Sequence, residues 1–106
     1  MKMIIRGKIQ NINGRKLNTL LKKSNKVVFL DVRDKEDYDE YHIPQSINID
    51  ASEVFEKIYM LEKYKYTDLV VYCYHGSRSK GVCAILSMNG FENVYNLKSI
   101  DNYKPL

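Results

Sequence analysis

Two short apolar runs constrain most strongly what this chain can fold into. Residues 27–30 (Val-Val-Phe-Leu) and 69–72 (Leu-Val-Val-Tyr) are rich in β-branched and aromatic side chains, and polar residues follow both runs. Continuous apolar runs of this kind are typical of strands that are buried on both faces of a parallel sheet. Ligands in such sheets bind beyond the carboxyl ends of the strands. The residues that follow the two runs, Asp31-Val32-Arg33 and Cys73, are therefore candidates for chemistry.

Weaker strand patterns occupy residues 3–5, 46–49 and 93–97, and helical patterns lie between the strands. Strands that alternate with helices predict an α/β domain with a mostly parallel sheet of about five strands, flanked by helices on both faces. The 106 residues fit one domain, residues 1–106. A chain of this size buries about 60–70% of its unfolded surface, so it needs no metal or disulfide to build a core.

Four helices are predicted from capping residues and from apolar side chains at helical spacing. Their expected caps and apolar residues are Asn13 with Leu17, Leu20 and Leu21; Asp34, for a short helix through Glu40; the capping box of Asp50 and Glu53, with Val54, Phe55, Ile58 and Leu61 inward; and Ser77 or Ser79, before Val82, Ile85 and Leu86. The last helix should end at Met88, where Asn89-Gly90 supplies a left-handed stop.

Composition narrows the classes of function. The net charge is +4, but the lysines are scattered without a long basic run, so a solvated surface is favoured over a nucleic-acid site. The apolar stretch near the N-terminus is three residues long. Because this is far too short for a signal peptide or a membrane span, we expect a cytoplasmic protein with no membrane partner. Two cysteines in that compartment favour a reactive thiol over a structural disulfide.

The segment from Cys73 to Ser79 joins a predicted strand to a predicted helix. A chain that turns tightly here can aim successive backbone N–H groups at one point, and the helix adds the positive end of its dipole. Gly76 permits backbone angles that other residues resist, and Arg78 adds a fixed positive charge. Comparable sites lower a cysteine pKa from about 8.5 to roughly 3.5–7.5. The alternative is an inert, buried Cys73, which needs neither the glycine nor the arginine.

These motifs resemble those of the single-domain rhodanese-like sulfurtransferases. The similar segments are Cys73-x-x-Gly76-x-Arg78-Ser79, which looks like the active-site loop; Phe29-Leu30-Asp31-Val32-Arg33 with Glu36-x-Tyr38 and His42-Ile43-Pro44, which look like the first signature; and residues 90–97, which match the helix exit and the final strand. The resemblance extends from about Ile12 to Leu97, and the three motifs stand in the family's order and spacing.

The resemblance implies a mechanism that needs no metal and no organic cofactor. Cys73 attacks a small anionic sulfane-sulfur donor such as thiosulfate and keeps the sulfur as a persulfide. A thiophilic acceptor, which is cyanide, a thiol or a partner protein, then removes that sulfur. The residues implied to bind the persulfide and the donor are Tyr74, His75, Gly76, Ser77, Arg78 and Ser79.

Several of these residues have a structural interpretation as well. For Arg78, two roles are equally favoured: a salt bridge that braces the loop, and orientation of the anionic donor. A position at the solvent-facing rim is favoured for Tyr74 and His75, and helix capping for Ser77 and Ser79.

Three further residues are interpreted as structural support: Asp31, Arg33 and His42. The first two can fix adjacent loops at the strand end, and the histidine is expected to be hydrogen-bonded rather than to act as a base. Cys83 is expected in the core, with a resolving thiol for Cys73 as the alternative. No metal-ligand spacing is found among the cysteines and histidines.

Several positions depart from the family pattern. They are Tyr41, where glycine is usual; Gln45-Ser46, in place of Gly-Ala; Lys98-Ser99-Ile100, in place of a Gly-Gly stretch; and Tyr103, in place of a common tryptophan. These positions are expected at the pocket rim and the C-terminal cap. We therefore expect them to affect the choice of substrate more than the thiol chemistry.

Two other functions fit the same fold. Cysteine-dependent phosphatases and arsenate reductases use a loop cysteine and arginine, but the loop of the related cell-cycle phosphatases is longer than the four residues between Cys73 and Arg78. A smaller ring should suit a sulfur atom better than a phosphate. No clear acid for the leaving group stands near the loop, although Asp31 or Asp34 could be argued. The second alternative is a binding module, against which the retained Cys73, Gly76 and Arg78 argue.

Overall fold

The computed structural model describes residues 8–105, and within them lies a five-stranded sheet in which every strand pair is parallel. The strands are β1 (Lys8–Asn11), β2 (Val27–Asp31), β3 (Ile47–Asn48), β4 (Asp68–Cys73) and β5 (Asn93–Ser99). Their order across the sheet is β1-β5-β4-β2-β3, with β4 at the centre. The predicted α/β fold with a parallel sheet is confirmed.

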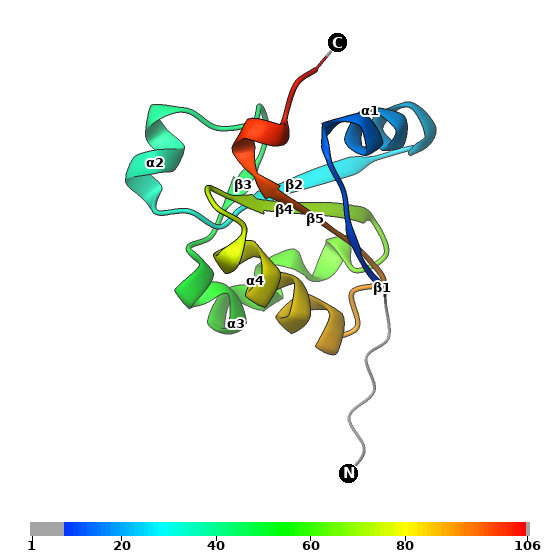
Figure 1. The fold of residues 1–106 in the computed structure, drawn as a ribbon. Coiled ribbons are helices and arrows are strands. Elements are labelled where there is room, and N and C mark those ends of the chain that lie inside the picture. Colours follow the sequence, from blue (N-terminus) through cyan, green and yellow to red (C-terminus); the bar gives the residue numbers. More distant parts are fainter. Residues whose placement is uncertain (1–7, 106) are drawn as a thin grey trace.

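Helices cover both faces of the sheet, as predicted (Figure 1). They are α1 (Gly14–Lys23), α2 (Lys35–Glu40), α3 (Val54–Lys57) and α4 (Ser77–Met88), with 3₁₀ segments η1 (Ala51–Glu53), η2 (Ile58–Tyr64) and η3 (Ile100–Asn102). Figure 1 shows α1 and η3 on one face and α3 and α4 on the other. Connections of this kind bring the carboxyl ends of the strands to one edge.

Side chains of β4 alternate between two hydrophobic cores. Leu69, Val71 and Cys73 belong to the core that contains residues of α3 and α4. Val70 and Tyr72 belong to the core that contains Leu17 of α1 and Ile100 of η3. Because successive strand side chains point to opposite faces, a strand covered on both sides must be apolar at every position. This explains the continuous apolar run that predicted the strand.

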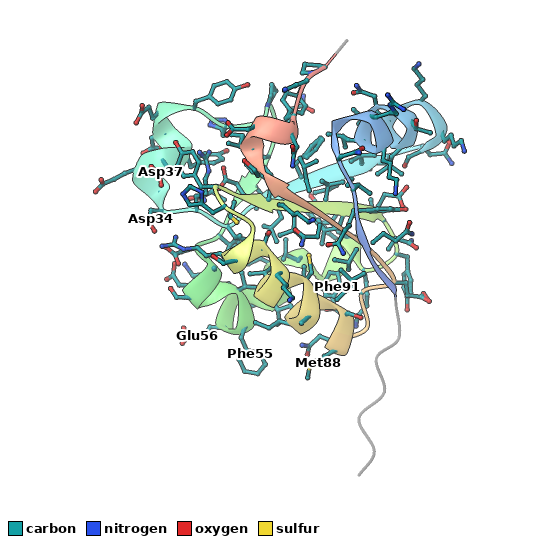
Figure 2. The ribbon with its side chains drawn as sticks, viewed as in Figure 1. Asp34, Asp37, Phe55, Glu56, Met88 and Phe91 are labelled. Carbon is teal, nitrogen blue, oxygen red and sulfur yellow. The ribbon has the colours of Figure 1, made fainter. Side chains whose placement is uncertain are left out.

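The segment from residue 51 to residue 64 differs from the single helix that the sequence predicted. It is divided into η1, α3 and η2, and the Asp50 carboxylate accepts the Ser52 N–H at 3.0 Å, so the expected capping box with Glu53 does not form. Val54 and Leu61 are buried, but Phe55 is 68% exposed and projects away from α3 (Figure 2). The prediction that Phe55 faces inward was wrong, because Val54, Leu61 and the partly buried Ile58 are the side chains of the predicted face that pack on the core.

The other helix signals are largely confirmed. The Asn13 side chain accepts the Lys16 N–H at 2.9 Å and caps α1, which buries Leu17 but leaves Leu21 39% exposed. After the last residue of α4, Gly90 has φ +90° and ends that helix in the left-handed conformation. The strand expected at residues 3–5 lies outside the described residues, and β1 at Lys8–Asn11 was not predicted.

Two departures from the family pattern occupy backbone conformations that favour glycine. Gln45 has φ +66° and Lys98 has φ +71°, and they are the two non-glycine residues with positive φ in the described chain. Such angles cost a side-chain-bearing residue about 1–2 kcal/mol. Both positions are ones where the family pattern has glycine, so the chain keeps the backbone shape without the residue that adopts it most easily.

Gly90 and Gly81 allow a matched test of whether a left-handed backbone conformation at Gly90 requires glycine. An alanine Cβ at Gly90 meets an unfavourable φ and Lys65 Cε at 3.1 Å, whereas Gly81 lies within α4 with open space around an added Cβ. Gly90→Ala should lower the free energy of unfolding by about 1–2 kcal/mol, and Gly81→Ala should raise it by about 0.5–1 kcal/mol. Urea unfolding measures both. A gain in stability for Gly90→Ala would contradict the left-handed stop.

Candidate active site

Cys73 ends the central strand β4, and the loop that follows it turns into the first residues of α4. The residue is 2% exposed, so its thiol is nearly enclosed. Gly76 occupies the N-cap position of α4 with φ +92°, and its N–H donates to Cys73 Sγ at 3.0 Å. A Cβ at Gly76 would also lie 3.3 Å from Lys98 Cβ. The positive φ and this close approach explain why the sequence needs glycine at position 76, as predicted.

The groups around Cys73 favour its thiolate. Burial by itself raises the pKa of the thiol, but hydrogen bonds from the Ser79 hydroxyl and from the N–H groups of Ser79, Gly76 and His75 outweigh burial and lower the pKa below its ordinary value. These donors are uncharged, and they are fixed by the turn into α4. The thiolate is therefore held mainly by oriented dipoles.

Ser79 is held in place by a buried hydrogen-bond network that reaches β1 and β5. Its hydroxyl donates to Asn96 Oδ1 at 2.8 Å, and Asn96 Oδ1 also accepts the Lys98 N–H at 3.0 Å. The Asn96 amide donates to Asn11 Oδ1 at 3.2 Å. Ser79 and Asn96 are both buried. The same hydroxyl lies 3.2 Å from the carbonyl oxygen of Gly76. Since it has one proton, it can donate fully to only one of Asn96, Gly76 and the thiolate at a time.

The predicted capping role of the two serines was wrong. The N-cap of α4 is Gly76, which has no side chain to contribute, and no side-chain cap bond forms there. Ser79 serves the network instead, while Ser77 is exposed and lines the cavity. No sequence pattern pointed to Asn96, because a single asparagine within a strand pattern looks like an ordinary exposed polar position.

A cavity of about 130 Å³ lies over the thiol. The residues that line it are Arg33, Asp37, Cys73, Tyr74, His75, Ser77 and Arg78. Tyr74 and His75 are exposed, which agrees with the predicted rim position. A neighbouring depression of about 310 Å³ shares Arg33, Asp37 and Tyr74 and extends to Tyr41 and Tyr103. These last two departures from the family pattern therefore lie at the rim, as expected.

Arg33 and Asp31 form a buried ion pair beside the cavity. Arg33 Nη2 lies 2.7 Å from Asp31 Oδ2, and Arg33 Nε donates to the same carboxylate at 3.1 Å. Arg33 Nη2 also donates to the carbonyl oxygen of Tyr41 at 2.6 Å. The pair joins the end of β2 to the loop after α2, which agrees with the structural interpretation. The Tyr41 contact uses only the backbone, so a tyrosine can stand where glycine is usual.

Arg78 forms a salt bridge with Asp34, which lies between β2 and α2. Its Nη1 lies 3.0 Å from Asp34 Oδ1, and both side chains are more than half exposed. The bracing interpretation of Arg78 is therefore realised in the structure. Asp34 makes no side-chain cap bond to α2, contrary to the prediction, because its carboxylate faces Arg78 instead.

His42 and Cys83 lie outside the lining of the cavity. The Nδ1 atom of His42 is 2.7 Å from the carbonyl oxygen of Tyr38, and the two rings stack with centroids 3.8 Å apart. Cys83 is fully buried, and burial, with a smaller contribution from the charge of Cys73, raises its pKa to about 12. Cys83 is thus a core thiol, as predicted, and both cysteines are free.

Residues 8–105 contain no group of three or more His, Cys, Asp or Glu side chains arranged to hold a metal ion. Among the helices of that part of the chain, none has the length and apolar character needed to cross a membrane.

Comparison with known proteins assigns most of this sequence to one family. The model of the rhodanese-like domain matches residues 15–102, a span that contains Cys73, the loop after it and the Asp31–Arg33 pair. The chain belongs to the rhodanese-like family. The recognition made from the three motifs is confirmed.

Relatives and solved structures agree with the family assignment. Thiosulfate sulfurtransferase GlpE of Coxiella burnetii is 36% identical over 77 residues, which cover 73% of this chain and 70% of the relative. A rhodanese-related protein from Thermoplasma volcanium has a TM-score of 0.74 at 31% identity, covering 90% of this chain and 95% of that one. A rhodanese with anions from E. coli has a TM-score of 0.70 at 31% identity, covering 76% and 95%.

Ser79→Ala tests the hydroxyl beside the thiol of this rhodanese-like chain. Loss of that donor should raise the pKa of Cys73, so the pH at which iodoacetamide alkylation reaches half its maximal rate should move upward. Ser77→Ala is the matched control, because Ser77 is exposed and is not among the donors that lower the pKa of the thiol. Both variants are measured in a Cys83→Ser background. Equal midpoints for the two alanine variants would contradict the role given to Ser79.

Proposed function

We propose that this protein is a sulfurtransferase that carries sulfane sulfur as a persulfide on Cys73. The single observation that supports this most directly is the nearly enclosed thiol whose pKa is lowered by hydrogen bonds from Ser79, Gly76 and His75. A thiolate is the nucleophilic form of cysteine. Relatives named thiosulfate sulfurtransferase support an enzyme of this kind and a thiosulfate-type donor.

In the first step, the Cys73 thiolate attacks the outer sulfur of thiosulfate. A bond forms between Sγ and that sulfur while the S–S bond of thiosulfate breaks, and the electron pair of this bond leaves with sulfite. The product is a persulfide anion on Cys73. We expect the N–H groups that hold the thiolate to hold the negatively charged outer sulfur as well, and the donor to enter through the cavity of about 130 Å³.

In the second step, an acceptor removes the outer sulfur. Cyanide attacks that sulfur, the S–S bond of the persulfide breaks, and thiocyanate leaves while Cys73 returns to a thiolate. A thiol or a thiol of a partner protein reacts in the same way and becomes a persulfide. We expect an acceptor larger than cyanide to contact Tyr74 and His75, which are exposed and line the cavity.

Phosphatase chemistry is the alternative that the same loop allows. Of the acids that the sequence suggested, Asp31 is tied to Arg33 and Asp34 is tied to Arg78. Asp37, which the sequence analysis did not single out, lines the cavity. An acid for a leaving group is therefore available. The feature that disfavours a phosphatase is the length of the loop, which has four residues between Cys73 and Arg78. A misplacement of about 1 Å can reduce a rate on the order of a hundredfold.

Thiosulfate treatment tests the proposed persulfide. The purified protein should gain the mass of one sulfur atom, and cyanide or a reductant should remove it. Cys73→Ser should abolish the gain, whereas Cys83→Ser, which changes a buried core thiol, should retain it. Intact-protein mass spectrometry and thiocyanate formation measure the two steps.

Two results would contradict this proposal. Efficient hydrolysis of aryl phosphates without any gain of sulfur on Cys73 would favour the phosphatase. Equal loss of sulfur transfer in Cys73→Ser and a correctly folded Cys83→Ser would favour a mechanism that needs two thiols.

A one-residue insertion after Ser77, which gives the loop a phosphatase-like length, should weaken sulfur transfer because it spreads the N–H groups apart.

A further inference from the structure

The charged side chains that line the thiol cavity are not equally free to act on a ligand. Both arginines are already paired, Arg33 with Asp31 at 2.7 Å and Arg78 with Asp34 at 3.0 Å. Asp37 also lines the cavity, and its carboxylate has no ion pair or side-chain hydrogen bond among residues 8–105. Apart from the reacting Cys73 thiolate itself, the charge of Asp37 is therefore the one that the lining side chains leave without an ion-pair partner.

Asp37 keeps a defined place beside the loop. It lies in the first turn of α2, and its carbonyl oxygen accepts the Tyr41 N–H at 3.1 Å, which fixes the end of that helix. Figure 2 shows Asp34 and Asp37 together on the side of the molecule where α2 stands beside the start of α4. The Asp37 side chain is half-buried, so solvent screens it less completely than a fully exposed carboxylate.

We infer that Asp37 is a specificity-determining residue that selects against sulfur donors of high negative charge. This inference rests on the proposed sulfurtransferase function and narrows its donor class. Thiosulfate is a dianion, and a thiosulfonate is a monoanion that gives up its outer sulfur in the same way and releases a sulfinate. An unpaired carboxylate at the cavity repels the dianion about twice as strongly as the monoanion. The favoured donors are thiosulfonates and organic persulfides of low charge.

Helix α2 supplies a matched control for the charge change. Asp39 lies on the same helix, is exposed, and pairs with Lys35 at 2.6 Å outside the lining of the cavity. Asp37→Asn and Asp39→Asn thus remove the same charge from one helix, but only the first removes it from the cavity wall. Asp37→Asn should lower the KM for thiosulfate about three- to tenfold and the KM for an aryl thiosulfonate clearly less. Asp39→Asn should change neither.

Alkylation of Cys73 tests the same charge without any sulfur transfer. Iodoacetate is an anion and iodoacetamide is its neutral analogue, and both react with the thiolate. The ratio of their rates cancels the fraction of thiolate, so it reports the charge near Cys73. In a Cys83→Ser background, Asp37→Asn should raise the iodoacetate-to-iodoacetamide ratio about three- to tenfold. Added salt should raise the ratio of the parent protein and reduce the difference between the two.

The two measurements separate the failure of this inference from the failure of the proposed function. If Asp37→Asn raises the alkylation ratio but no variant accepts sulfur, the sulfurtransferase proposal fails and the charge-selecting role of Asp37 stands for another anionic ligand. If Asp37→Asn and Asp39→Asn give the same alkylation ratio as the parent protein, the inference about Asp37 is overturned. An equal rise in both variants overturns it too, because a general change in net charge then explains the result.

Discussion

The hydrogen bonds that backbone N–H groups make to Cys73 are the interaction on which the rest of this structure depends. They require a thiol at the end of a central strand, a left-handed residue at Gly76 and the first turn of α4 within a few residues. None of these donors carries a full charge. An array of fixed dipoles stabilises negative sulfur whether it belongs to the thiolate or to a persulfide, and it needs no reorganisation as the charge moves outward by one atom.

The parts of the fold that the sequence predicted best are those determined by burial alone. The runs at residues 27–30 and 69–72 became β2 and β4 because a strand covered on both faces must be apolar throughout. The segment after Asp50 was harder to predict. Its apolar side chains fit a continuous helix, but the chain adopts two 3₁₀ segments around a short α3, and Phe55 turns outward. Local periodicity cannot distinguish these cases, since 3₁₀ and α turns differ by less than one residue.

The site could be predicted only in part, for a similar reason. Cys73, Gly76 and Arg78 lie in one short segment, so their spacing is visible in the sequence. Asn96 and Asp37 reach the loop from β5 and α2, and only the packing of the sheet brings them there. Asn96 lies seventeen residues from its partner Ser79. The local sequence around a single polar residue such as Asn96 does not reveal a hydrogen bond to a distant residue.

The departures from the family pattern are accommodated through the backbone or through a new hydrogen bond. Ser46 replaces an alanine, and its buried hydroxyl lies 3.0 Å from the hydroxyl of Tyr72, which also accepts the Ile43 N–H. Buried polar groups must be paired in this way to avoid a loss of stability. Tyr41 meets Arg33 through its carbonyl oxygen alone. Each replacement thus preserves the contact that the local structure needs, while its side chain changes the surface at the rim.

Lys98 shows most clearly why a strained residue persists at this position. The register between β4 and β5 shifts between Val71 and Tyr72, which pair with Asn96 and Lys98, so Leu97 is left between the two pairs as a bulge. This bulge brings Lys98 against Gly76 and directs its N–H to Asn96 Oδ1, the atom that also receives the Ser79 hydroxyl. Positive φ at a non-glycine residue is kept only where surrounding contacts fix it. The strain at Lys98 is therefore part of the same network that holds Ser79 beside the thiol. A backbone change that relieved this strain would take the Lys98 N–H away from Asn96 Oδ1 and leave that buried oxygen with one donor fewer.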